Sequence, residues 1–400
     1  MTAASNVRPT RWRFQFGLRS LFGLVTVAAS MLAAVGYLHH RLSQQWQAIE
    51  EAKQAVAAEI ERLDRINDCP NYPHPGINAT TVPQKWFGLD LSRINKRYVD
   101  VTRLTVIGNV PVDLVARKMD QFPKLMSFRL ESKSLKDRDL VRLSRLAKLE
   151  EVEVRADTLD GSFLSRLPPD AGLTKLSLRS ERLDDAALRS ACRFSSLTSL
   201  ELMGLQLESA ATLLELGELT QLQSLSLTGQ FSLAEINVLE NLPQLHSLHL
   251  APGDASIDDK TFAQLCRCQA ITDLQLLDLK LTQPETLREL ARVQKLFSLD
   301  LHGDFPNEGL AFLTTLPELE FVALDSPLLD NDGIRRVAQS PTIYHLTIVS
   351  EQVDDEILDD LAALPSLWGL TLWNTKTTTQ GIARLRSKRP DIDVSRQPRD

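Results

Sequence analysis

The chain has 400 residues, of which 43% are hydrophobic and 24% charged, and its formal net charge is −7. This composition excludes a chain that is disordered over most of its length. The charge is uneven, because residues 1–49 carry five arginines and no acid, so the acidic remainder argues against nucleic acid as its partner.

The first predicted element is a membrane-spanning helix at residues 18–38. Leu21 to Leu38 form a run of 18 residues without a charge, about 27 Å long as a helix against a hydrocarbon core of about 30 Å. Arginines precede the run and acids follow it, which places a basic head, residues 1–17, in the cytoplasm. We expect a signal anchor with the rest of the chain in the periplasm or otherwise outside the cytoplasm. The alternative is a cleaved signal peptide.

A helical stalk is predicted at residues 39–66. Its apolar residues recur at steps of three and four, with one charged position: Trp46, Ile49, Lys53, Val56, Ile60 and Leu63. This short coiled-coil pattern indicates either a parallel homodimer or a helix that lies on the repeats or the membrane. Closely spaced prolines then break any helix, so we expect a Pro-rich linker at residues 67–84 and an N-terminal cap at residues 85–100.

A phrase of about 24 residues repeats through residues 101–394 and is followed by a short tail, residues 395–400. Each copy has apolar residues at positions 1, 4 and 6, and apolar residues at helical spacing follow about ten residues later. The first part predicts a strand with one buried face and the second a helix. The copies begin at Val101, Leu125, Leu149, Leu173, Leu197, Leu222, Leu245, Ile271, Leu296, Leu319, Ile343 and Leu367.

This phrase resembles the leucine-rich repeat. The resemblance implies an α/β horseshoe-shaped solenoid of about 12 repeats of ~24 residues, with parallel strands on the concave side and helices or 3₁₀ turns on the convex side. The repeats look like the ribonuclease-inhibitor and F-box-associated type, although position 9 lacks the asparagine or cysteine common in the family. With its head, anchor and stalk, the whole chain is similar to the single-pass membrane-anchored leucine-rich repeat proteins of planctomycete bacteria.

No residue set in the sequence indicates catalysis, a cofactor or a metal site. Phosphate-binding, dinucleotide-binding and zinc-protease motifs are missing from the sequence. Cys192, Cys266 and Cys268 fall at helical positions and are interpreted as small buried hydrophobic residues. Cys69 lies in the predicted linker, where an intermolecular disulfide is possible outside the cytoplasm.

The candidate binding residues occupy positions that the repeat leaves free. In the C-terminal copies these positions, on or beside the concave strands, hold Phe297, Phe321, Tyr344, Trp368, Trp373, His302 and His345. Exposed aromatic residues favour partner binding, unless a C-terminal tail packs over them. The histidines are either solvated polar residues or a proton- or metal-sensitive patch. In the N-terminal copies the same positions carry charges of mixed sign, which is typical of a solvated face or an ion-pairing interface.

From the repeats, the predicted anchor and these aromatic residues, we expect a scaffold that mediates protein–protein interaction through its concave face and has no enzymatic activity. One alternative is an envelope-organising protein that binds glycan or peptidoglycan near Trp368 and Trp373. The other is a substrate-selecting adaptor subunit of a larger complex. The repeat pattern itself is specific for the fold and does not decide among these functions.

Overall fold

The computed structural model describes residues 77–83, 85–86, 89–90, 99–107, 125–133, 135–146 and 148–397. Among these residues, none of the helices combines the length and the apolar character needed to cross a membrane. The predicted head, transmembrane helix and stalk lie outside the described residues, as does Cys69.

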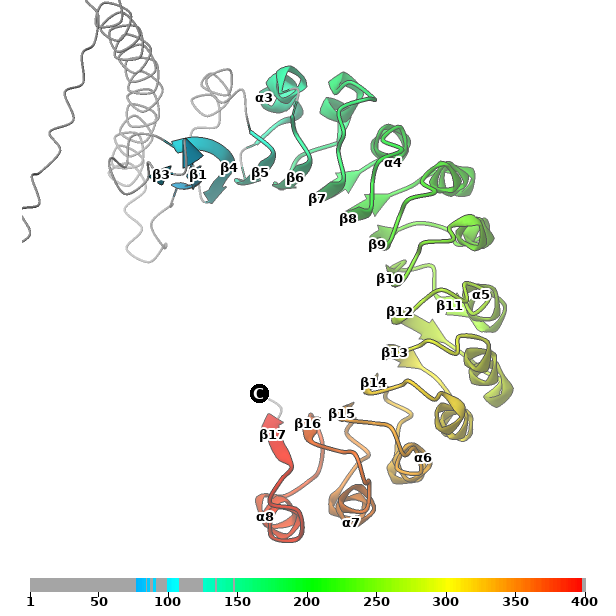
Figure 1. Ribbon diagram of the computed structural model, residues 1–400. Coiled ribbons are helices and arrows are strands. Elements are labelled where there is room, and N and C mark those ends of the chain that lie inside the picture. The colour runs from blue at the N-terminus through cyan, green and yellow to red at the C-terminus, as the bar shows by residue number, and fades with distance from the viewer. Residues whose placement is uncertain are drawn as a thin grey trace, which may run out of the picture. The chain divides into compact units, whose positions relative to one another are not determined.

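One parallel sheet runs through the repeats and confirms the predicted leucine-rich repeat solenoid (Figure 1). Each repeat adds one strand, which pairs with the strands of the repeats before and after it. The successive strands are β4 (Val99–Ile107), β5 (Ser127–Glu131), β6 (Glu151–Arg155), β7 (Lys175–Leu183), β8 (Ser199–Gln206), β9 (Ser224–Gln230), β10 (Ser247–Ala251), β12 (Asp273–Lys280), β13 (Ser298–Asp304), β14 (Phe321–Asp325), β15 (His345–Val349), β16 (Gly369–Trp373) and β17 (Asp393–Gln397).

Among the described residues, four further strands lie outside this series. The short strand β11 (Ile257–Asp258) pairs with β12. Strand β1 (Ile77–Pro83), within the predicted linker, neighbours β4 in the sheet. In the predicted cap, β2 (Lys85–Trp86) and β3 (Leu89–Asp90) form a small antiparallel pair. The linker and cap boundaries themselves remain predictions.

From β5 onward, helices return the chain from one strand of the series to the next and line the convex side of the arc (Figure 1). Packed helices need about 8–10 Å of separation, whereas neighbouring strands need about 4.8 Å. The sheet therefore curves with the strands on the inside. The α-helices are α3 (Asp137–Leu140), α4 (Asp185–Cys192), α5 (Asp259–Leu265), α6 (Asn331–Val337), α7 (Leu358–Ala362) and α8 (Thr379–Lys388). The 3₁₀ helices are η3 (Val141–Arg145), η4 (Ser162–Arg166), η5 (Ala210–Glu218), η6 (Ile236–Asn241), η7 (Pro284–Arg292), η8 (Asn307–Thr315) and η9 (Asp355–Ile357).

The core lies between the sheet and the helices. Positions 4 and 6 of each repeat lie on its strand and point toward the core. Leu225, Leu248 and Leu274, all at position 4, therefore follow one another in register across three strands. The side chain of Leu248 is 1% exposed. Positions 3, 5 and 7 point to the concave side because successive side chains of a strand alternate between faces. The repeat frame thus leaves these positions free for function.

In several repeats the turn after the strand is stabilised at position 8, one residue before the family's asparagine position. The hydroxyl of Ser180 donates to the carbonyl oxygen of Leu159 at 2.7 Å, and that of Ser350 donates to Leu329 at 2.5 Å. Both serines are buried. In other repeats a glycine takes this position, as at Gly204, where φ is +88° and a Cβ atom would collide with the carbonyl of Ser180. In these repeats, serine or glycine at position 8 therefore takes the place of an asparagine ladder.

A second device joins repeats on the helical side. Each of four aspartates is the first residue of its helix and accepts hydrogen bonds from the chain where the next repeat's helix begins. Asp185 accepts from the backbone N–H groups of Glu208 at 2.8 Å and Ser209 at 3.3 Å. Burial alone raises the pKa of Asp185, but hydrogen bonds from Thr212, Glu208 and Ser209 lower it below its ordinary value. We call this set the aspartate ladder: Asp137, Asp185, Asp259 and Asp355.

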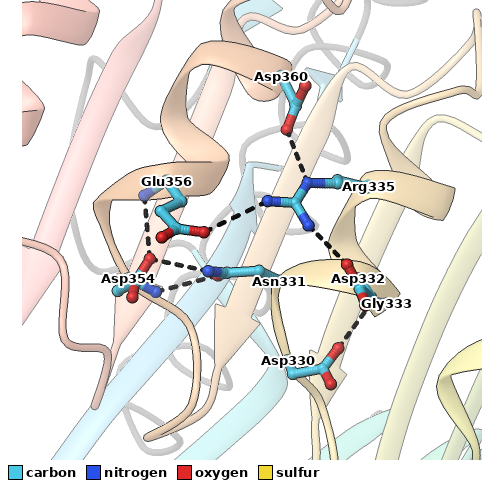
Figure 2. Close-up of polar contacts among 8 residues, drawn as sticks. All are labelled: Asp330, Asn331, Asp332, Gly333, Arg335, Asp354, Glu356 and Asp360. Carbon is cyan, nitrogen blue, oxygen red and sulfur yellow. Dashed lines mark hydrogen bonds and ion pairs between the residues drawn. The ribbon is translucent and has the colours of Figure 1, made fainter.

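Near the C-terminus a polar cluster joins α6 to the η9–α7 segment (Figure 2). Asn331 donates to Asp354 at 2.8 Å and accepts from its backbone N–H at 3.1 Å. Arg335 lies between Glu356, at 3.5 Å, and Asp360, at 3.3 Å. Exposed ion pairs contribute little to stability, so we interpret this cluster as a device that fixes the spacing of adjacent repeats.

Candidate binding surface

Four aromatic side chains form a ladder along the amino ends of the concave strands in the C-terminal repeats. Phe297, Phe321, Tyr344 and Trp368 are 39%, 37%, 39% and 49% exposed. Three of them occupy position 2, just before β13, β15 and β16, and Phe321 occupies position 3 at the start of β14. Consecutive repeats place these positions on neighbouring strands, about 4.8 Å apart. We call this set the aromatic ladder.

The rings of the aromatic ladder contact one another in chain order. The ring centroids of Phe297 and Phe321 are 5.1 Å apart, and those of Phe321 and Tyr344 are 6.2 Å apart with edge-on geometry. Tyr344 and Trp368 stack at 5.5 Å with an interplanar angle of 5°. These distances lie in the range in which aromatic pairs attract. The ladder is therefore one continuous apolar strip.

His345 extends the strip at position 3 of β15. Its ring stacks on Phe321 with centroids 6.3 Å apart and an angle of 19°. The ring is close to the backbone of Gly369, where a Cβ atom would collide with the imidazole Nδ1. Thr371 lies within hydrogen-bond distance of the other ring nitrogen, at 3.4 Å. Glycine at position 3 of the next repeat thus makes room for the imidazole.

A second group, of polar side chains, lies at positions 5 and 7 of the repeats that contribute β12 to β14. His302 contacts Asp300 through Nε2 at 2.8 Å and Asp325 through Nδ1 at 3.2 Å. These two carboxylates, Asp300 first, raise the pKa of His302 to about 10. His302 is therefore an imidazolium at neutral pH. Gln275 donates to the remaining oxygen of Asp300 at 2.8 Å, so the carboxylate is held from both sides.

His249 behaves in the opposite way at position 5 of β10. Burial lowers its pKa, against the opposing effect of Asp300. Its Nδ1 lies 3.0 Å from the hydroxyl of Ser226, on the adjacent strand β9. A neutral imidazole and an imidazolium thus occur two repeats apart on one face. Within the described part of the chain no group of three or more His, Cys, Asp or Glu residues could hold a metal ion.

Ion pairs occupy the concave side of the N-terminal repeats. Arg129 contacts Glu153 at 3.1 Å across β5 and β6, and Arg155 contacts Glu131 at 3.4 Å in the opposite sense. Lys175 on β7 pairs with Glu151 at 3.4 Å. Charges of mixed sign therefore neutralise one another on this part of the face.

Comparisons with known proteins give similarity in architecture only. No family model matches the chain, and curated proteins give no match. A leucine-rich repeat protein of Leptospira interrogans is 18% identical with a TM-score of 0.43, over 70% of this chain and 74% of its own. The Listeria monocytogenes internalin inlF is 17% identical with a TM-score of 0.46, over 78% and 93%. The plant peptide hormone receptor RGFR1, solved in complex with RGF2, is 14% identical with a TM-score of 0.40, over 74% and 53%. At these values, the assignment of the fold rests on the repeats and strand pairing of the chain itself.

The structure separates the predicted site residues into two edges. The aromatic ladder and His345 lie at the amino ends of the strands. Trp373, which is 45% exposed, and His302 occupy position 7, toward the carboxyl ends. At about 3.3 Å per residue, position 7 lies about 13 Å from position 3. The sequence identified the aromatic residues individually but gave no signal for Gly369, whose role depends on the ring packed against it.

The described cysteines are buried and unsuited to chemistry. Burial raises the pKa of the Cys192 and Cys268 thiols to about 12, and it raises that of Cys266 further. A protonated, buried thiol is a poor nucleophile and a poor metal ligand. These three residues act as small apolar side chains of the core, as the spacing indicates.

Proposed function

We propose that the protein is a membrane-anchored scaffold whose repeat domain binds another protein outside the cytoplasm, at the aromatic ladder. The observation that carries this proposal is the contact of four aromatic side chains that each remain at least 37% exposed. Aromatic residues bury much area at low entropic cost and dominate binding energy at interfaces. A contiguous exposed apolar strip is typical of an interaction site.

The anchored part of the proposal is supported by the sequence alone. The uncharged run within residues 18–38 has the length of a membrane span, and the arginines before it favour a cytoplasmic N-terminus. The stalk, residues 39–66, would set the repeats away from the membrane and could pair two copies. Treatment of intact cells with a protease after outer-layer permeabilisation should digest the repeats. Digestion only after the inner membrane is ruptured would contradict this orientation.

The binding part is tested by co-purification of the full chain from native membranes after mild crosslinking. A variant with Phe321→Ser, Tyr344→Ser and Trp368→Ser should lose the crosslinked protein. The control is Leu214→Ser, because Leu214 is 48% exposed on the convex helix η5. If the triple variant retains the same crosslinked protein as the control, the aromatic ladder is not the binding surface.

Glycan binding is the second candidate, and the stacked pair Tyr344–Trp368 is the observation that favours it. Trp368 has a flat indole ring and is 49% exposed, and the C–H groups of a sugar ring pack against the face of such a ring. This function predicts that the full chain sediments with protein-free cell-wall material and that Trp368→Ala abolishes the sedimentation. Sedimentation that is unaffected by Trp368→Ala would exclude the ladder as a glycan site.

A further inference from the structure

The concave side of the C-terminal repeats carries more acids than cations. Positions 2, 3, 5 and 7 of the repeats that contribute β12 to β17, counted in β17 by its register with β16, are all described, and none of them holds lysine or arginine. Arg396 of β17 pairs with Leu372 and therefore falls at position 6. The acids at these positions are Asp273, Asp300, Glu320, Asp325 and Asp393. This differs from the N-terminal repeats, where the same positions hold both signs. A net negative potential therefore covers the part of the face that carries the aromatic ladder.

Three of these acids lie along the aromatic ladder itself. Asp273 is opposite Ser298, which follows Phe297 in the chain. Glu320 directly precedes Phe321. Asp393 is opposite Gly369, which follows Trp368. The amino edge of the sheet thus presents an acid, the ladder with an acid inside it, and a further acid, in this order across six strands.

These three carboxylates are exposed and have no ion-pair partner within the described residues. Asp273 accepts a hydrogen bond from the neighbouring hydroxyl of Thr272 at 2.6 Å, which leaves its charge in place. Asp300 and Asp325 differ, because they hold the imidazolium of His302 between them. The uncompensated negative charge is therefore concentrated at the edge of the ladder.

We infer that the aromatic ladder binds an extended protein segment that carries arginine or lysine side chains. This inference rests on the function proposed above. The face of an aromatic ring is electron-rich and attracts a cation, most often the planar guanidinium of arginine. Carboxylates beside the rings complement the same charge and disfavour an acidic partner. Exposed rings with unpaired carboxylates beside them thus match one kind of side chain.

The length of the site follows from the strand spacing. From β12 to β17 there are five steps of about 4.8 Å, or about 24 Å along the ladder and the acids at its two ends. An extended segment rises about 3.3 Å per residue, so about seven residues span this distance. Alternate side chains of such a segment point the same way, which brings three or four cations to the ladder. A short basic stretch in extended conformation is therefore the expected partner element.

The test uses the full-length protein in a neutral detergent and three labelled octapeptides with blocked ends. Each peptide alternates serine with arginine, citrulline or glutamate, and citrulline has nearly the shape of arginine without the charge. Fluorescence anisotropy gives the dissociation constant. We expect the arginine peptide to bind at least about tenfold more tightly than the citrulline peptide, and the glutamate peptide not to saturate.

Two triple variants that remove the same number of negative charges locate the peptide-binding site. Asp273→Asn, Glu320→Gln and Asp393→Asn together should weaken binding of the arginine peptide at least about tenfold. Glu150→Gln, Asp170→Asn and Glu181→Gln together change the net charge equally, at exposed positions of the N-terminal repeats, and should leave binding unchanged. Equal binding of the arginine and citrulline peptides, or equal weakening by the two variants, would overturn the inference.

The variant with Phe321→Ser, Tyr344→Ser and Trp368→Ser is here called the ladder variant. Its co-purification test distinguishes failure of this inference from failure of the proposed function. If the ladder variant loses its crosslinked protein while arginine and citrulline peptides bind alike, only the preference for cations is wrong. If the ladder variant keeps its crosslinked protein, the scaffold function at this surface fails, and the inference fails with it.

Discussion

The N-terminal and C-terminal parts of the concave face have the same backbone and opposite surface chemistry. Across β5 to β7 the outward side chains form ion pairs with one another, such as Arg129 with Glu153. Across β13 to β16 they form an aromatic strip bordered by carboxylates without ion-pair partners. Ion-paired side chains satisfy one another, whereas exposed rings and lone carboxylates gain from a partner. This contrast is the reason for proposing the binding surface at the C-terminal end of the solenoid.

The largest expected effect is on the free energy of unfolding, and it tests whether the N-terminal and C-terminal repeats have the same packed core. Leu176→Ala in β7 and Leu346→Ala in β15 each remove a buried position-4 leucine, both at most 1% exposed. Each substitution should lower the free energy of unfolding by about 2–5 kcal/mol, because it leaves a cavity. Denaturant unfolding measures the two costs. A cost below about 1 kcal/mol in one part alone would show that its repeats are not packed as described.

The second prediction concerns the contacts between repeats on the helical side. Asp259→Ala should lower the free energy of unfolding by about 1–3 kcal/mol, because it removes hydrogen bonds to the Thr282 and Gln283 N–H groups. Burial alone raises the pKa of Asp259, but hydrogen bonds from Thr286 and Thr282 lower it below 3.8. The ionised Asp259 carboxylate therefore stabilises the fold above pH 3.8, and this stabilisation is lost as the pH falls through the lowered pKa.

The exposed Asp254 provides the control for this prediction. Asp254→Ala should change the unfolding free energy by less than about 0.5 kcal/mol, as surface substitutions usually do. The difference between Asp259→Ala and wild type should shrink in acid. A difference that stays constant between neutral pH and pH about 3 would contradict the role of the ionised carboxylate.

The third prediction sharpens the contrast between the two surfaces. A double-mutant cycle on Tyr344 and Trp368 should give a coupling energy of about 0.5–1.5 kcal/mol, the usual value for a stacked pair. The same cycle on Arg129 and Glu153 should give about 0.2–1 kcal/mol and should fall at high salt. Salt should leave the aromatic coupling unchanged. Equal salt dependence in the two cycles would remove the physical distinction between the surfaces.

The last prediction is the pH dependence of stability from His302, which solvent screening reduces because its side chain is 37% exposed. Its pKa is raised from 6.5 to about 10 by Asp300 and then Asp325. A raised folded-state pKa gives stability that is fully present below pH 6.5 and is lost as pH rises toward 10. In His302→Gln this loss should be absent when unfolding is measured at several pH values. Parallel pH profiles of variant and wild type would show that the imidazolium makes no net contribution.

The sequence predicts the frame better than the surface. The period of the sequence identifies positions 1, 4 and 6. The positions of Phe321 and Trp368 within their repeats predict that both lie near the concave strands. Which rings touch depends on the offset between positions 2 and 3 in adjacent repeats, which only the strand register resolves. The same holds for His302, because Asp325 reaches it from the next strand, 23 residues along the chain.

Some features had no single-residue signal. Gly369 matters because the His345 ring lies over its backbone, and nothing in the local sequence announces that contact. Ser180 and its counterparts replace the expected asparagine one position earlier, through hydrogen bonds to the preceding repeat. Trp373 shares a repeat with Trp368 but lies toward the other edge of the sheet. Contacts between repeats, rather than patterns within one repeat, decide these roles.

Photocrosslinking in the cells that produce the protein tests the central claim most directly. A photoreactive benzoylphenylalanine is placed at Phe321 in one variant of the full chain and at Arg129 in another. These sites lie on concave strands in the two contrasting parts of the face. We predict a discrete crosslinked protein from Phe321 and none from Arg129. Crosslinking from Arg129 alone, or from neither site, would contradict the aromatic ladder as the binding surface.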